Sequence, residues 1–160
     1  MEKKKLSKSL EDYLEAIYVV AQEKKIVRVK DLIKMLNVKT ASVIGALKKL
    51  EQKGFVEHEH YGYIELTPEG EKRARRIFEM HTVLMKFLTD FLRVNEVIAE
   101  KDACLMEHCI SEETFNKIIQ LMRLLETSPD RLPTWFAELS TLMDTPPQAK
   151  AVVTPCDKCA

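Results

Sequence analysis

Apolar residues recur at helical spacing along most of the chain and predict a mainly α-helical protein. The first such stretch opens at Ser9, which has the character of an N-cap, and runs to about Glu23. Further stretches with an apolar stripe cover residues 30–37, 41–52, 68–92, 98–108 and 111–125. One segment departs from this period: apolar and polar residues alternate on both sides of His60, Tyr61 and Gly62, as is typical of a β-hairpin.

The order of these elements predicts a winged helix-turn-helix in the first half of the chain. Three helices precede the hairpin, and Asn37 and Val38 form a tight turn between the second and the third. In this arrangement the third helix enters the major groove of DNA, with small residues in its first turn and basic residues nearby. The expected DNA contacts are Arg28, Lys39, Thr40, Ala41, Ser42, Gly45, Lys48 and Lys49. For each lysine, a solvated helix face is the alternative.

Charge is divided unevenly although the whole chain is neutral. Residues 1–80 carry 17 basic against 13 acidic side chains, and residues 81–160 carry 8 against 12. This modest asymmetry is compatible with a basic surface for nucleic acid in the first half and an acidic, cation-attracting second half. No apolar run has the length of a membrane span, and the lysines at positions 3–5 are not followed by the apolar region of a signal peptide. We therefore expect a cytoplasmic protein with no membrane partner.

Five potential metal ligands lie within the nine residues 100–108. If this segment is helical, Cys104, Glu107 and His108 stand at i, i+3 and i+4 and share one face. A thiolate, a carboxylate and an imidazole form a plausible donor set for a divalent metal, but the remaining ligands must come from elsewhere in the chain. The alternative is a solvated acidic helix face with a buried cysteine and one surface histidine.

Other polar positions are ambiguous when they are considered singly. Asp12 and Glu15 share a face of the first helix, where surface acids near a helix N-terminus are common. His81 borders a wide apolar stripe in the long fourth helix, where the alternative to a metal ligand is an ordinary half-buried histidine. The stripes of the fourth and sixth helices offer more apolar surface than a small domain needs, which predicts a two-fold homodimer built from residues 71–126.

For the C-terminal part of the chain, the sequence predicts a linker, a short helix over 134–143 and a tail. Cys156 and Cys159 form a C-x-x-C pair there, which could hold an extra metal, form a reversible disulfide or do neither. The predicted organisation is a winged helix-turn-helix in 1–70, an all-α dimerisation and metal-binding domain in 71–126, and the linker and tail in 127–160.

Three separated motifs resemble the metal-dependent repressors of the diphtheria toxin repressor and manganese transport regulator family. They are Ser9–Tyr18 (SLEDYLEAIY), Met80-His81, and Asp102–His108 (DACLMEH) followed by residues 111–113 (SEE). The resemblance runs from about Leu6 to Leu125. It implies a bacterial or archaeal dimeric repressor that binds double-stranded operator DNA of metal-homeostasis genes when Fe(II) or Mn(II) fills sites between the first helix and the second domain. The chain length favours the architecture without an SH3-like third domain.

Carried onto this sequence, the family's ligand positions fall on six residues: Asp12, Glu15, His81, Cys104, Glu107 and His108. Asp12 and Glu15 are similar to the manganese regulators, whereas Cys104 is similar to the iron repressors. Carboxylates and imidazoles suit both metals, and one thiolate shifts the preference slightly towards Fe(II). Co(II), Ni(II) or Zn(II) are expected to substitute in vitro, because affinity follows the Irving–Williams order.

Two other functions are alternatives to a metal-dependent repressor. A metalloenzyme acting on a small-molecule substrate is disfavoured, because the chain lacks His-Glu-x-x-His, a pair of Glu-x-x-His motifs and a glycine-rich phosphate loop. A winged-helix regulator that senses redox state through Cys156 and Cys159, or through Cys104 and Cys109, is the alternative.

Overall fold

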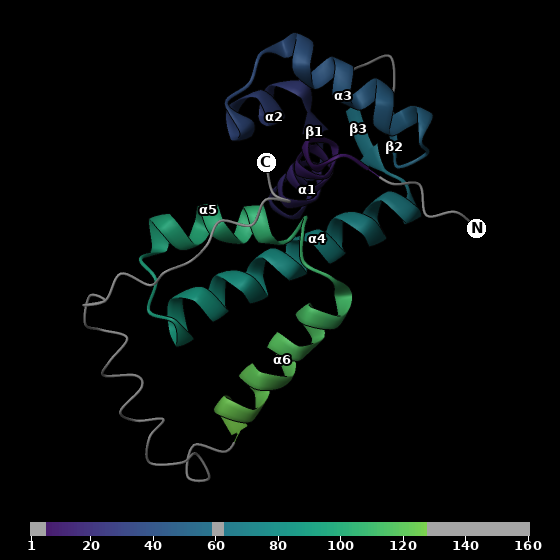
Figure 1. Ribbon diagram of the computed structural model, residues 1–160. Helices are drawn as coiled ribbons and strands as arrows, with labels where there is room; N and C mark the ends of the chain where they lie inside the picture. Colours follow the sequence, from purple (N-terminus) through teal and green to yellow (C-terminus); the bar gives the residue numbers. More distant parts are fainter. Residues whose placement is uncertain (1–5, 59–62, 128–160) are drawn as a thin grey trace, which may run out of the picture.

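The computed structural model describes residues 6–58 and 63–127 and confirms a mainly α-helical protein with a small sheet (Figure 1). The elements in order are α1 (Lys8–Glu23), β1 (Val27–Arg28), α2 (Val29–Leu36), α3 (Thr40–Gln52), β2 (Val56–His58), β3 (Tyr63–Leu66), α4 (Pro68–Lys86), the π-helical turn η1 (Phe87–Phe91), α5 (Glu96–Met106) and α6 (Glu112–Thr127). No helix within these two ranges has the length and apolar character needed to cross a bilayer.

The first unit is a winged helix-turn-helix. Its sheet has the strand order β1-β3-β2 with antiparallel pairing, so Val27 faces Ile64 and Val56 faces Leu66. Helices α1, α2 and α3 pack around one apolar cluster. The turn between α2 and α3 is closed by Asn37, which adopts the left-handed conformation at φ 52° that asparagine tolerates better than most residues.

The start of α4 is fixed firmly against the wing. Thr67 caps α4 by accepting a hydrogen bond from Gly70 N at 3.0 Å, and its hydroxyl donates to the carbonyl oxygen of Gly54 at 2.8 Å. A Cβ atom on Gly70 would lie 1.8 Å from the carbonyl oxygen of Phe55. Only glycine allows this close approach of the two backbones, which sets the direction in which α4 leaves the first unit.

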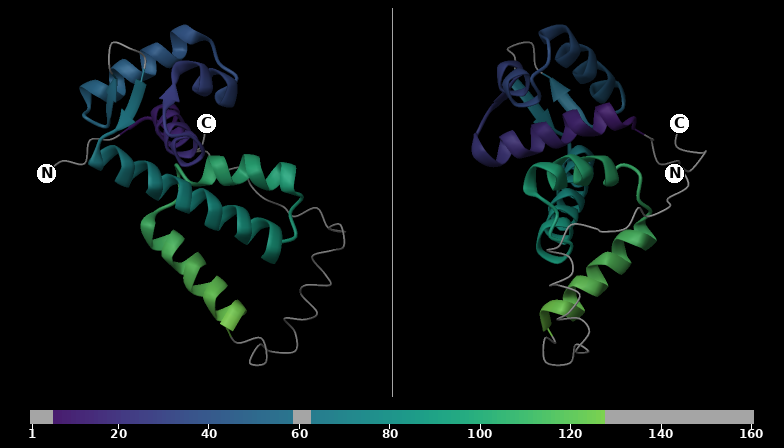
Figure 2. Two further views of the ribbon diagram at one scale, coloured as in Figure 1. Left: turned by 180° about the vertical axis from the view of Figure 1, so that it is seen from behind. Right: turned by 60° about the vertical axis from the view of Figure 1, so that its left-hand side comes forward.

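Helix α4 joins two apolar clusters. Ala74 belongs to the cluster of the winged unit, whereas Met80 and Leu84 belong to a second cluster with α5 and with Phe115 of α6. Helix α1 lies between the other elements of the winged unit on one side and helices α4 and α5 on the other (Figures 1 and 2). A side chain on α1 can therefore belong to the first unit and still contact the second.

Two boundaries differ from the sequence prediction. The N-cap of α1 is Ser7 rather than Ser9, because the carbonyl oxygen of Ser7 accepts the first hydrogen bonds of the helix. The fifth helix ends at Met106, whose carbonyl oxygen accepts from the backbone N–H groups of Cys109 and Ile110 and closes a turn. Glu107 is thus the C-cap and His108 lies in the turn, so the expected continuous helix through His108 was wrong.

Candidate metal centre

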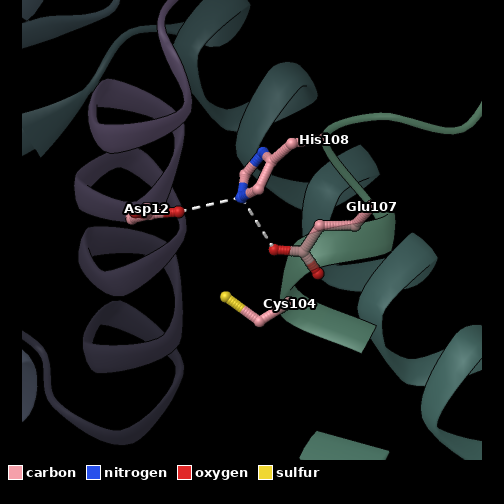
Figure 3. A group of neighbouring side chains, drawn as sticks. All are labelled: Asp12, Cys104, Glu107 and His108. Atoms are coloured by element: carbon pink, nitrogen blue, oxygen red, sulfur yellow. Dashed lines mark ion pairs between the residues drawn. The ribbon is translucent and has the colours of Figure 1, made fainter. Parts of the chain in front are cut away.

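Helix α1 buries its apolar residues in the first cluster and presents acidic side chains to the second unit. Leu14 and Ile17 are fully buried in the first cluster. Asp12 and Glu15 are partly buried and lie towards the end of α5, and in Figure 3 the carboxylate of Asp12 points from α1 to His108. Helix α1 therefore places two carboxylates beside residues more than ninety positions downstream.

Four potential ligands converge from the two units. Asp12, Cys104, Glu107 and His108 each offer one ligand atom, and these atoms all lie within 4.8 Å of one another. His108 Nε2 is 2.8 Å from Asp12 Oδ1 and 3.1 Å from Glu107 Oε1 (Figure 3). The cluster combines nitrogen, oxygen and sulfur donors, a set that suits divalent first-row metals.

The contacts of His108 explain why this cluster fits a cation. Its Nδ1–H donates to Glu11 Oε2 at 2.8 Å, which leaves a lone pair on Nε2 in the neutral imidazole. Among the described residues, Asp12 Oδ1, Glu107 Oε1 and His108 Nε2 are buried atoms without a hydrogen-bond partner. Three buried acceptors directed at one point repel one another unless a positive charge lies between them. The donor set therefore fits a divalent cation.

A second cluster shares one residue with the first. Glu15, His81 and Glu107 also offer ligand atoms within 4.8 Å of one another. The Glu107 side chain is completely buried, with Oε1 facing the first cluster and Oε2 accepting from His81 Nδ1 at 2.8 Å. Glu107 thus contacts both clusters, one through each carboxylate oxygen.

Several of the candidate ligands have raised pKa values, so protons compete with a cation for them. The hydrogen bond with Glu107 raises the pKa of His81 to about 9, although burial lowers it. Burial, followed by the charge of Glu107, raises the pKa of Glu15 to about 7, and burial also raises the pKa of the Cys104 thiol. At neutral pH His81 is therefore protonated and Glu15 only partly ionised, so a cation must displace protons to bind here.

The structure brings all six predicted ligand residues together in these two overlapping clusters. Their role as ligands stays a prediction. All eight predicted DNA contacts are exposed, and five of them lie at the N-terminal end of α3 or immediately before it. The guanidinium of Arg28 lies 5.5 Å from the centre of the Tyr63 ring, beside the wing.

Sequence reasoning missed Glu11, which is only 7% exposed. Its signal was its position three residues before Leu14 and seven before Tyr18, on the apolar stripe of α1, where a charge needs a buried partner. Glu100, one of the five potential ligands in residues 100–108, belongs to neither cluster, although its Oε2 lies 3.3 Å from His81 Nε2.

The redox alternative has no support in the part of the chain that the structure describes, where Cys104 and Cys109 are both free thiols. The predicted linker, the short helix over 134–143, Cys156 and Cys159 lie outside the described residues.

Comparisons with known proteins agree with this geometry. Residues 5–64 match the family model described as the iron dependent repressor, N-terminal DNA binding domain, and residues 67–136 match its metal binding and dimerisation domain. An HTH-type transcriptional regulator of Methanocaldococcus jannaschii is 37% identical over 114 residues, which cover 71% of this chain and 91% of that protein. The HTH-type transcriptional regulator MntR of Lysinibacillus sphaericus is 34% identical over 122 residues, covering 76% and 87% of the two chains.

Solved structures give the same result. The T. acidophilum IdeR structure aligns with a TM-score of 0.63 at 25% identity, over 75% of this chain and 55% of that one. A manganese-dependent transcriptional repressor in complex with manganese aligns with a TM-score of 0.61 at 28% identity, over 68% and 50%. The chain thus spans about half the length of these solved relatives. Two adjoining family models that together match most of its length show that the chain belongs to the diphtheria toxin repressor and manganese transport regulator family of metal-dependent transcriptional repressors.

Proposed function

We propose that the chain is a homodimeric repressor that binds operator DNA of metal-homeostasis genes when Fe(II) or Mn(II) occupies the two clusters around Glu107. The observation that carries the proposal is the origin of the donor groups. Asp12 and Glu15 belong to a helix of the winged unit, whereas Cys104, Glu107 and His108 come from the end of α5. A cation held by both sets ties the two units together.

The first position would be held by Asp12, Cys104, Glu107 and His108, and the second by Glu15, His81 and Glu107. When bound, the cation supplies the positive charge that lets these carboxylates, the thiolate and the imidazole lone pairs lie close together. The thiolate of Cys104 favours Fe(II) slightly over Mn(II), while the carboxylates and imidazoles accept either. The role is regulatory rather than catalytic.

The DNA contact would be made by the first two turns of α3. Thr40, Ala41, Ser42 and Gly45 are exposed and small, so the backbone of these turns can approach base edges closely. Lys48 and Lys49 are exposed on the same helix, and Lys39 precedes it. Together with Arg28 beside the wing, these cations suit phosphate contacts on either side of the groove.

Exposed apolar residues of the second unit support the homodimer through residues 71–126. Val97, Ile98 and Leu105 of α5 are 66%, 54% and 55% exposed, and Leu121 and Leu124 of α6 are 45% and 56% exposed. So many large apolar side chains on two helices of one unit favour a covering partner. A second copy of this chain would bury them across a two-fold axis and leave the two α3 helices free for successive major grooves, about 34 Å apart.

The division into 1–70, 71–126 and 127–160 follows from this proposal. Two apolar clusters support the division into two units, and they meet within α4 between Ala74 and Met80. Because α4 is shared between the two units, a cation that joined α1 to the end of α5 would act on the orientation of the winged unit. A state with correct α3 spacing that holds the cation about 2–3 kcal/mol better would bind the operator roughly 30–150-fold more tightly with metal than without.

The test is operator binding by fluorescence anisotropy, with Fe(II), Mn(II), Co(II) and Zn(II) compared under anaerobic, thiol-reduced conditions. Asp12→Ala and His108→Ala should abolish the metal stimulation and leave the fold and the dimer intact. Asp102→Ala is the matched control, because Asp102 is a partly buried acid of α5 that belongs to neither cluster. Unchanged stimulation in Asp12→Ala and His108→Ala would refute the site assignment.

A further inference from the structure

Glu11 is a buried acid next to the proposed ligands that belongs to neither cluster. It accepts a hydrogen bond from His108 Nδ1 with Oε2, at 2.8 Å, and from the guanidinium of Arg73 with Oε1. The His108 side chain is 4% exposed and that of Glu11 9% exposed, so water screens their contact little. The three residues come from α1, from α4 and from the turn after α5.

The contact with Glu11 decides which nitrogen of His108 faces the site. A carboxylate can only accept, so Nδ1 must carry the proton of this hydrogen bond. In the neutral imidazole Nε2 then has the lone pair, and it points at Asp12 Oδ1 and Glu107 Oε1. Without an acceptor at Nδ1, a neutral imidazole would be free to place its proton on Nε2, which would donate to these carboxylates and obstruct a cation.

Arg73 compensates the buried carboxylate of Glu11. An isolated buried carboxylate is costly, whereas one paired with a guanidinium and a second donor is compensated. Arg73 reaches Glu11 from α4, and its own side chain is 44% exposed. The pair lies within the winged unit and the adjoining part of α4, so it presents a fixed anion to His108 of the second unit.

We propose that Glu11, held by Arg73, is the positioning residue of the metal centre. It fixes the ring orientation of His108 with the proton on Nδ1, and it forms a contact between α1 and the turn after α5. This inference rests on the proposed metal site. A carboxylate behind a ligating histidine typically accounts for about a 10–100-fold difference in metal affinity.

The experiment combines two readouts on the full chain. Long-range ¹H–¹⁵N spectra of the metal-free protein report which nitrogen of His108 is protonated. Anaerobic absorbance titration with Co(II) gives the dissociation constant, and the thiolate-to-cobalt band reports Cys104. The variants are Glu11→Met, which removes the acceptor at similar volume, Glu11→Gln, which keeps an acceptor without charge, and Arg73→Met. Arg75→Met is the control, because Arg75 pairs with Glu71 on the exposed face of the same helix.

The wild type should show a proton on Nδ1 of His108. Glu11→Met should lose this preference and bind Co(II) about 10–100-fold more weakly. Glu11→Gln and Arg73→Met should weaken binding in the same direction by less, for Arg73→Met up to about fivefold, whereas Arg75→Met should bind like the wild type. If Glu11→Met does not fold by circular dichroism, the two milder variants carry the test.

Unchanged Co(II) affinity and an unchanged tautomer in the variants, with tight binding by the wild type, would overturn this inference alone. A wild type that binds no Co(II) would overturn the proposed metal site as well. The tautomer readout separates positioning from a merely structural role, since a loss of packing would not exchange the two ring nitrogens.

Discussion

Replacement of Glu107 by glutamine in the metal-free protein should lower the pKa of His81 from about 9 to 6.5 or below. Glutamine keeps the size of the buried side chain but removes its charge. The hydrogen bond to Glu107 is the largest cause of the raised pKa, and the charge of Glu107 adds to it. Burial acts in the opposite direction, and the remaining carboxylates, Glu100 and Glu15, contribute less. Without Glu107, burial and these weaker neighbours roughly cancel or leave the neutral imidazole favoured.

The assay is an NMR titration of the histidine Cε1–H signals after removal of metal with EDTA, with His81 assigned through a His81→Gln variant. Glu100→Gln is the matched control. Its carboxylate lies 3.3 Å from His81 Nε2 but is 63% exposed. Its loss should therefore lower the pKa of His81 by roughly 0.7 pH unit at most, the effect of an exposed ion pair. A pKa of His81 that stays near 9 in Glu107→Gln would refute the assigned pairing.

The same titration has a consequence for stability and for metal binding. Because the pKa of folded His81 is raised above its usual 6.5, the protonated His81–Glu107 pair stabilises the metal-free fold fully below about pH 6.5. This contribution is lost as the pH rises through about 9. Over the same window the proton competes with a cation, so the apparent Co(II) affinity of the wild type should rise with pH. Isothermal titration of the wild type at several pH values would show this rise.

Three further substitutions test other parts of the structure. Gly45→Ala adds a Cβ with no atom within 4 Å, so the free energy of unfolding should rise by about 0.5–1 kcal/mol while operator affinity by anisotropy falls; undiminished affinity would place Gly45 outside the DNA contact. Gly70→Ala should cost about 1–3 kcal/mol in urea unfolding because of the clash with Phe55, and an unchanged midpoint would contradict this. Cys104→Asp should shift metal preference from Fe(II) towards Mn(II) in competition titrations, and an unaltered ratio would show that the thiolate is not a ligand.

The helices and the wing could be predicted from the sequence because their signals are local. The helical spacing of apolar residues predicts α1 to α6. Thr67 and Pro68 indicate the start of α4, and Asn37, which adopts a positive φ, indicates the turn after α2. The end of α5 could not be placed in this way. Residues 107 and 108 continue the helical spacing in sequence, and only the hydrogen bonds to the carbonyl oxygen of Met106 show that the helix has ended.

The ligand residues were found for a different reason, namely chemistry that recurs at family positions. Their partition into two clusters was not accessible, because spacing along the chain does not show that the two oxygens of Glu107 face different neighbours. The contacts of Glu11 with Arg73 and His108 join residues 62 and 97 positions apart. No local pattern encodes such pairs, although a charge on the apolar stripe of α1 indicates that a partner exists.

The charges at this interface explain how a bound cation could affect the orientation of the winged unit. Asp12, Glu15 and Glu107 crowd together where α1 meets the end of α5, and like charges at such a distance oppose docking of the winged unit. In the metal-free state the proton on His81 and the partial protonation of Glu15 relieve some of this repulsion. The contact of Glu11 with His108 holds the two units in register at the same time. A cation that binds this junction therefore adds attraction at the point that orients α3.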